Sequence, residues 1–172
     1  WYQIGNVITI LDARLEEKLQ PQAEYLLASE AAHAGAVVLS RAEEATEEEM
    51  QATITHLNRA LEKVHCGRRL DQEIIRKGSL SLTDADFAKI QQCGYVQENY
   101  QKMDLTEENS FDTVYVMERE MTVEEILAGM KKIFADPSCG EVFRIKGFMQ
   151  EENGSWIEVN ATRHELQKQP IK

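Results

Sequence analysis

The chain has 172 residues, 42% of them apolar, so it can bury the core of one medium domain or two small ones, and disorder throughout is excluded. Acidic residues outnumber basic ones by 30 to 19, so the formal net charge is -11, and neither half of the chain is basic. This charge argues against nucleic acid or an anionic membrane as the main partner. No stretch resembles a signal peptide or approaches the roughly 20 apolar residues that span a bilayer.

Two apolar runs near the start of the chain predict neighbouring parallel strands. They cover residues 7–13 and 36–39, and the second leads into the polar tetrad 40–43. Apolar runs without polar alternation are typical of strands buried on both faces. A helical stripe lies between them, and Gly35 is placed to end that helix in the left-handed conformation. We therefore expect a right-handed βαβ unit, with Asp12 and the tetrad at the edge of the sheet where ligands bind.

The next segments predict two more helices and a linker. Thr46 and Glu49 form a capping box, and apolar residues then recur at helical spacing until Cys66-Gly67. Residues 68–81 carry little pattern, a short helix follows from Thr83 to the stop at Gly94, and the polar stretch 97–109 is the most plausible linker.

The second half predicts a different architecture. Residues 112–118 alternate as in a half-buried strand, and a second capping box at Thr122 opens an amphipathic helix. Strands are expected over 142–149 and 155–161, joined by a hairpin with Asn-Gly in its turn, whereas 162–172 is ambiguous. The order strand, helix, strand, strand is that of an α+β unit akin to a split βαβ, or ferredoxin-like, fold.

Two stretches together resemble one family. Residues 7–13, 36–43 and the sequence Leu57-Asn58-Arg59-Ala60 look like the later half of a CobW-like P-loop GTPase domain. The segment 143–148, whose Arg-Ile-Lys-Gly matches the common Arg-x-Lys-Gly, resembles the C-terminal domain of the same family. The resemblance implies a partial parallel-sheet GTPase domain over 1–104 and a CobW C-terminal-like α+β domain over 105–172.

The same resemblance implies a function and a site. It implies a cytoplasmic GTP-dependent protein that delivers or inserts zinc or cobalt into a client metalloprotein or other metal acceptor, or acts in cobalamin-type maturation. The family reads guanine with an Asn-Lys-x-Asp motif, and the matching positions here are Ser40, Arg41, Ala42 and Glu43. Glu43 keeps a carboxylate for the guanine nitrogens and Arg41 matches the lysine, but Ser40 lacks the amide of asparagine, so selectivity for guanine is left open. Glu43 as a solvated loop residue, and Asp12 in a turn or capping role, are the alternatives.

The catalytic parts of the family have no counterpart in this sequence. No Gly-Lys dipeptide occurs, so the loop that cradles phosphates is missing, and so are the family's magnesium-binding residues and its cysteine-rich metal motif. We expect GTP and magnesium to bind the complete protein, neither to bind this piece alone, and the piece to be inactive as an enzyme. The start at Trp1 rather than Met suggests a fragment.

Metal binding by the chain itself is weakly supported. His65-Cys66 is the one adjacent His/Cys pair, Cys93 is a conceivable third ligand, and a closed zinc site needs about four. The three cysteines, with Cys139, are odd in number and lack Cys-x-x-Cys spacing, so they are expected to be reduced thiols. His33 and His56 are interpreted as partly exposed structural histidines.

A second hypothesis keeps the fold and removes the nucleotide chemistry. In it the chain is a protein-interaction module that holds a partner through its acidic surface or exposed strand edges, and open edges also permit a homo-oligomer. Arg144 and Lys146 are expected on the outer or edge side of their strand, for partner contact or for edge protection. Trp156 is expected in core or interface packing.

Overall fold

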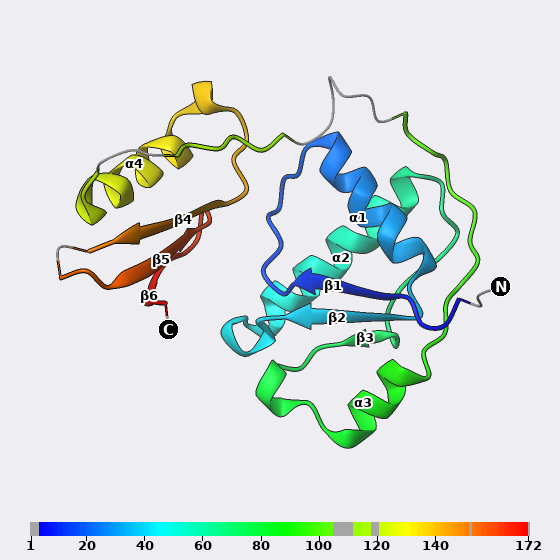
Figure 1. Cartoon of the computed structure of the whole chain (residues 1–172). Helices are drawn as coiled ribbons and strands as arrows, with labels where there is room; N and C mark the ends of the chain where they lie inside the picture. The colour runs from blue at the N-terminus through cyan, green and yellow to red at the C-terminus, as the bar shows by residue number, and fades with distance from the viewer. Residues whose placement is uncertain (1–3, 105–111, 118–120, 152, 172) are drawn as a thin grey trace. The chain divides into compact units, whose positions relative to one another are not determined.

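The computed structural model describes residues 4–104, 112–117, 121–151 and 153–171. The chain forms two compact units that divide between Asp112 and Thr113. Unit 1 contains the β-strands β1 (Ile8–Asp12), β2 (Ala36–Ser40) and β3 (Ile74–Ile75), and the helices α1 (Pro21–His33), α2 (Glu47–Lys63) and α3 (Asp84–Gln91) (Figure 1). Unit 2 contains helix α4 (Val123–Ala135) and the strands β4 (Ile145–Gln150), β5 (Trp156–Ala161) and β6 (Leu166–Pro170). Short 3-10 turns lie at Ala42–Glu44, Ser79–Ser81 and Pro137–Cys139.

The sheet of unit 1 is parallel, as the apolar runs predict. Its order is β1-β2-β3, and β1 pairs with β2 from Ile8 opposite Ala36 to Asp12 opposite Ser40. Helix α1 connects these two strands, so the predicted βαβ unit is confirmed. Strand β3 was not predicted, because two apolar residues inside the stretch 68–81 are too short a pattern to distinguish.

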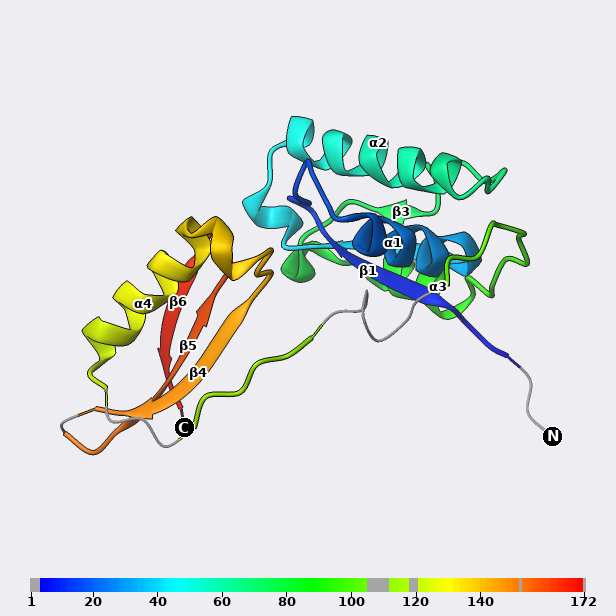
Figure 2. The ribbon, with the colours of Figure 1, turned by 90° about the horizontal axis from the view of Figure 1, so that it is seen from above.

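The core of unit 1 lies between the sheet and helices α1 and α2, which pack against each other (Figure 2). Leu39, Leu57, Leu61 and Leu70 are almost completely buried there. The expected capping box of α2 is present: the Thr46 side chain accepts from the Glu49 amide and the Glu49 carboxylate accepts from the Thr46 amide. The cap satisfies backbone amides at the start of α2, and the apolar stripe of the helix is buried against the rest of the core.

Gly35 acts differently from the expectation. Helix α1 ends at Ala34, whose φ is -66°, and Gly35 is not among the residues with positive φ. Instead a Cβ on Gly35 would lie 2.3 Å from the carbonyl oxygen of Cys93. The glycine is needed for close approach of two backbone segments. Left-handed residues occur at His65, just after α2, and at Gly94, which ends α3 as predicted.

An ion cluster around the buried Glu24 joins α1 to α2. The Glu24 carboxylate is 8% exposed, forms an ion pair with Lys63, and has Oε1 3.1 Å from Nε2 of His56. Because a carboxylate only accepts, the His56 Nε2–H donates this bond. Burial raises the pKa of Glu24, but hydrogen bonds from Lys63 and His56 outweigh this, so the pKa lies below the ordinary value of 4.5.

Unit 1 is therefore expected to lose stability in acid through Glu24. A lowered folded-state pKa means that the contribution is complete above the unfolded value of 4.5 and is lost as the pH falls through the folded value. Urea unfolding between about pH 7 and pH 3.5 should show this loss, and Glu24→Gln should make the profile flatter below pH 4.5. The matched control is Glu30→Gln, on the exposed part of the same helix, which should keep the wild-type profile. Equal profiles for wild type and Glu24→Gln would contradict the assignment.

Unit 2 has an antiparallel sheet of order β4-β5-β6, with α4 packed on one face. The predicted hairpin is present between β4 and β5, with Gly154 in the left-handed region at φ 84°. The capping box of α4 at Thr122 and Glu125 is also confirmed. Met130 of α4 meets Met149, Ile157, Val159 and Ala161 in the core of this unit.

One expectation for the second half of the chain is wrong. Residues 112–117 form no strand, and Val114, Tyr115, Val116 and Met117 are 72–84% exposed; residue 118 lies outside the described part of the chain. Alternation identifies a face that a strand can bury but not a neighbouring strand to pair with, so it does not by itself form a strand. Of the two expectations for Trp156, core packing is excluded and interface packing stays a prediction: the residue is 52% exposed, because its position on β5 alternates with the core residues Ile157 and Val159 and so faces away from α4.

Arg144 and Lys146 lie on the outer side, as expected. The edge strand β4 carries Lys146, whose Nζ is 3.0 Å from Glu158 of β5 and 5.0 Å from the centre of the Phe148 ring. Arg144 Nε donates to Asn160 Oδ1 at 2.7 Å. These cross-strand pairs favour protection of the sheet by charge and leave partner contact untested.

The first residues of the predicted linker pack on unit 1. The Gln101 amide donates to Val64 O at 2.7 Å, and the Tyr100 ring packs against Tyr25 and His33. Residues 105–109 of the predicted linker lie outside the described part of the chain. Among the described helices of both units, none combines the length and the apolar character that crossing a membrane requires.

Candidate functional site

The carboxyl edge of β1 and β2 brings several predicted site residues together. Asp12 and Ser40 are paired across the two strands, and the Ala13 amide donates to Ser40 O at 2.9 Å. The Ser40 hydroxyl donates to Leu11 O at 3.2 Å, so this side chain ties the strands together. The edge therefore exists as predicted, with Ser40 serving as a cross-strand link.

Arg41 turns the chain out of β2. Its φ of 57° is left-handed, and its guanidinium forms an ion pair with Oδ2 of Asp12. The other carboxylate oxygen of Asp12 accepts from the Arg14 amide at 2.9 Å, which is the predicted turn role of Asp12. Both side chains are about one-third exposed, so the pair lies at the surface of the edge, where a ligand can reach the guanidinium.

Glu43 meets a loop that sequence reasoning missed. The Ser79 hydroxyl donates to Glu43 Oε1 at 3.4 Å, and a Cβ on Gly78 would lie 2.5 Å from Glu43 Oε2. Gly78 and Ser79 follow β3, whose carboxyl end is at the same edge as that of β2 because the strands are parallel. The Gly78-Ser79 pair shortly after Ile74–Ile75 is the sequence feature that could have indicated a loop at this edge. Glu43 is nevertheless exposed, so its carboxylate stays accessible to a donor.

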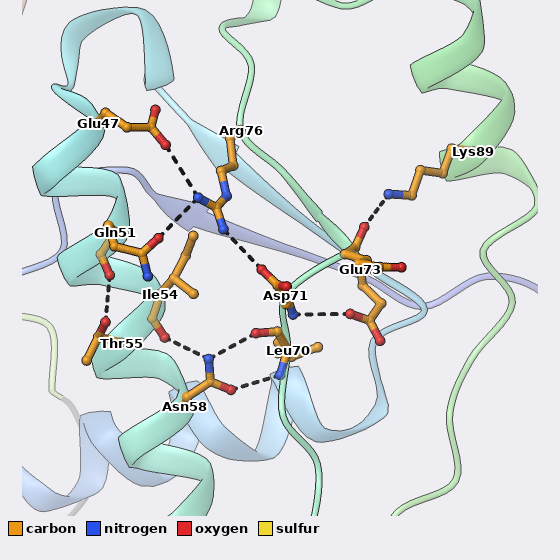
Figure 3. A network of polar contacts seen from close by, with 11 residues as sticks. Glu47, Gln51, Ile54, Thr55, Asn58, Leu70, Asp71, Glu73, Arg76 and Lys89 are labelled. Atoms are coloured by element: carbon orange, nitrogen blue, oxygen red, sulfur yellow. Dashed lines mark hydrogen bonds and ion pairs between the residues drawn. The ribbon is translucent and has the colours of Figure 1, made fainter.

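A polar network on α2 holds this missed loop (Figure 3). Asn58 Nδ2 donates to Leu70 O at 3.0 Å and Asn58 Oδ1 accepts from the Leu70 amide at 2.8 Å, both in the interior. Arg76 extends from the far end of the loop to Gln51 Oε1 at 3.2 Å and Asp71 Oδ1 at 3.3 Å. The segment 70–76 is thus attached to α2 at both ends, which sets where Gly78 and Ser79 lie.

The polar side chains at the edge are the exposed Glu43 carboxylate, the Ser79 hydroxyl that donates to it, and the Arg41 guanidinium already paired with Asp12. Within the described ranges, no group of three or more His, Cys, Asp or Glu side chains is placed to hold a metal ion. His65, Cys66 and Cys93 are among the described residues and belong to no such group, and the Cys93 thiol lies 3.8 Å from the carbonyl oxygen of Val7.

A concave region lies away from this edge, on α2 and the loop after β1. This groove of about 610 Å³ has Leu15, Ala52 and the buried His56 along it, with Glu17 and Glu48 among its acidic residues. Its walls are more apolar than polar, while its charged residues are mostly acidic. It is the surface that the interaction-module hypothesis would use.

Comparison with known proteins adds no assignment. No family model matches the chain, and no match was found among curated proteins or solved structures.

Proposed function

We propose that the chain is the later part of a CobW-like GTP-binding protein that delivers or inserts a metal, and that its tetrad 40–43 reads the base of GTP. One observation supports this most. Two parallel strands joined by a helix present Asp12 and the tetrad at one carboxyl edge, where nucleotide-binding sheets bind their ligands. Unit 2, a helix packed on an antiparallel sheet, is compatible with an α+β C-terminal domain, although the strand that a ferredoxin-like unit needs before α4 is not formed by residues 112–117.

The proposed reading uses the residues at this edge. The Glu43 carboxylate accepts hydrogen bonds from the ring and amino nitrogens of guanine, and Ser79 holds that carboxylate in place. Arg41, held by Asp12, lies along the base or ribose. GTP hydrolysis itself is phosphoryl transfer to water, assigned to phosphate- and magnesium-binding residues outside this chain. The metal, zinc or cobalt, is the cargo that passes to a client metalloprotein.

The test is calorimetry of the protein from the complete reading frame with GTP and with ATP. Glu43→Ala is expected to weaken GTP binding by about tenfold or more, because a hydrogen bond to a charged group contributes about 1.5–3 kcal/mol. ATP binding should not change. Glu48→Ala, an equally exposed carboxylate on α2, is the matched control and should bind GTP like wild type. Equal affinities for GTP and ATP would remove the proposed role of Glu43.

The second candidate function is a protein-interaction module without nucleotide chemistry. It is favoured because side chains of the tetrad already have partners within the chain. These contacts are Ser40 with Leu11, Arg41 with Asp12, and Glu43 with Ser79. The reading frame separates the two hypotheses, because an upstream Gly-x-x-x-x-Gly-Lys-Ser/Thr supports the GTPase. Absence of binding of either nucleotide by the complete protein would favour the module.

A further inference from the structure

Strand β1 lies at the border of the unit 1 sheet, with β2 on one side (Figures 1 and 2). The Ala36 amide donates to Val7 O at 3.5 Å, and the Ala13 amide donates to Ser40 O at 2.9 Å. Because backbone groups alternate along a strand, the odd-numbered residues of β1 bond to β2. The N–H and C=O groups of Ile8 and Ile10 therefore point outward, to an edge where no other strand of the described residues pairs with β1.

From Ile8 to Leu11 the side chains of this edge strand carry none of the usual protection, and its one charged residue, Asp12, lies at the end of the strand and pairs with Arg41. Natural edge strands are protected against pairing with other chains by lysine, proline or a bulge. The edge strand β4 of unit 2, for example, carries Lys146. Residues 7–11 have no charge and no proline. Ile8 is 42% exposed and Ile10 is 71% exposed. Such an edge is suited to pairing with another extended strand.

The opposite face of β1 is already covered. Thr9 is 6% exposed, and its hydroxyl donates to Glu30 O of helix α1 at 3.1 Å. Leu11 lies on the same face and is 8% exposed. Any strand that joins the edge must therefore place its own buried face on the α1 side and its exposed face beside Ile8 and Ile10.

We propose that the occupant of this edge is β1 of a second copy, paired antiparallel about a two-fold axis at Thr9. In this register Ile8 lies opposite the partner subunit's Ile10, and Ile10 lies opposite the partner subunit's Ile8. Both are pairs whose outward N–H and C=O groups exchange hydrogen bonds, so four backbone bonds form. The four isoleucine side chains fall on one face as cross-strand neighbours.

Self-complementarity is the reason for choosing a second copy. A two-fold interface requires one patch to match itself, and the residues 8 and 10 do so in backbone polarity, face and side-chain type. A register centred on Ile10 would instead place Asp12, already held by Arg41, opposite Ile8. A slip of one residue would set the exposed isoleucines against the covered face. The contact is small, so the dimer is expected to be weak and concentration-dependent.

The first experiment is light scattering of the whole chain over a concentration series. A mass that rises toward twice the monomer is expected. Ile10→Pro removes the outward N–H without affecting the β1–β2 ladder, since proline is tolerated on edge strands, and should keep the chain monomeric. Leu80→Lys, at a residue that is 99% exposed elsewhere in unit 1, is the control and should dimerise like wild type. Circular dichroism and urea unfolding of dilute samples verify that the variants are folded.

The second measurement is amide hydrogen exchange at low and high concentration. Protection of the Ile8 and Ile10 amides should rise with the dimer fraction, while Thr9 and Leu11, bonded to β2, should be protected at both concentrations. A chain that stays monomeric overturns the proposal. So does a dimer that survives Ile10→Pro, or a monomer in which the Ile8 and Ile10 amides are already protected by another segment.

Discussion

Replacing Asn58 by leucine is expected to lower the free energy of unfolding of unit 1 by about 2–4 kcal/mol. Asn58 is 8% exposed, and its amide satisfies both backbone groups of Leu70, a residue that is 1% exposed (Figure 3). Leucine has a similar volume but no polar atoms, so the Leu70 N–H and C=O would lose their partners in the interior. Each unsatisfied buried group costs about 1–3 kcal/mol.

Urea unfolding, followed through exchange of buried β2 amides such as that of Val37, measures this loss in unit 1 alone. The matched control is Thr55→Ala on the same helix, because the Thr55 hydroxyl is exposed and bonds only within α2, to Gln51 O at 2.8 Å. A change within about 0.5 kcal/mol is expected for it. If Asn58→Leu were as mild as the control, then Leu70 would have other partners and the attachment of segment 70–76 to α2 would rest elsewhere.

The consequence extends to the candidate site. Leu70 precedes β3, and β3 leads directly to Gly78 and Ser79, which contact Glu43. Asn58 therefore sets the position of the loop through the strand, without touching any ligand. It lies in the segment Leu57-Asn58-Arg59-Ala60 that carries part of the family resemblance. A structural requirement of this kind is enough to explain an asparagine in an otherwise apolar stripe.

Local chemistry made much of this fold predictable. The capping boxes at Thr46 and Thr122 and the Asn-Gly hairpin each depend on residues at most three apart, and all three are present. Parallel pairing of β1 and β2 was also predictable, because two apolar runs at this separation leave a crossover helix as the connection. The edge that holds Asp12 and the tetrad follows from that topology.

What sequence reasoning missed depends on partners that are distant in the chain. Ser79 meets Glu43, which is 36 residues away, through a two-residue strand that periodicity cannot detect. Residues 112–117 have a strand pattern, yet the described structure gives them no neighbouring strand. His56 lies on the buried side of α2 next to Glu24, which is 32 residues away, although it was expected to be partly exposed. Long-range polar contacts are chosen by packing, and a single sequence carries no record of them.

Gly35→Ala is expected to destabilise unit 1 by about 3 kcal/mol or more, the upper range for overpacking. The new methyl group would lie 2.3 Å from the carbonyl oxygen of Cys93 and 2.4 Å from that of Gly94. Both obstacles are backbone atoms, and the Gly94 carbonyl accepts from the Val7 amide at 2.9 Å, so the segment at Cys93 and Gly94 cannot move away without breaking this bond. The effect arises from space alone, since the φ of Gly35 is not positive.

Gly67→Ala is the control that separates space from chain entropy. Nothing lies within 4 Å of a Cβ on Gly67, and its φ is also not positive, so alanine should be neutral or stabilise by about 0.4–1 kcal/mol through the unfolded state. Both variants are measured by urea unfolding with β2 amide exchange as the readout for unit 1. Similar stabilities for the two variants would mean that the segment at Cys93 and Gly94 can move away from β2. In that case the isolated bridge between Ala34 and Tyr95 would not hold the end of α1 in place.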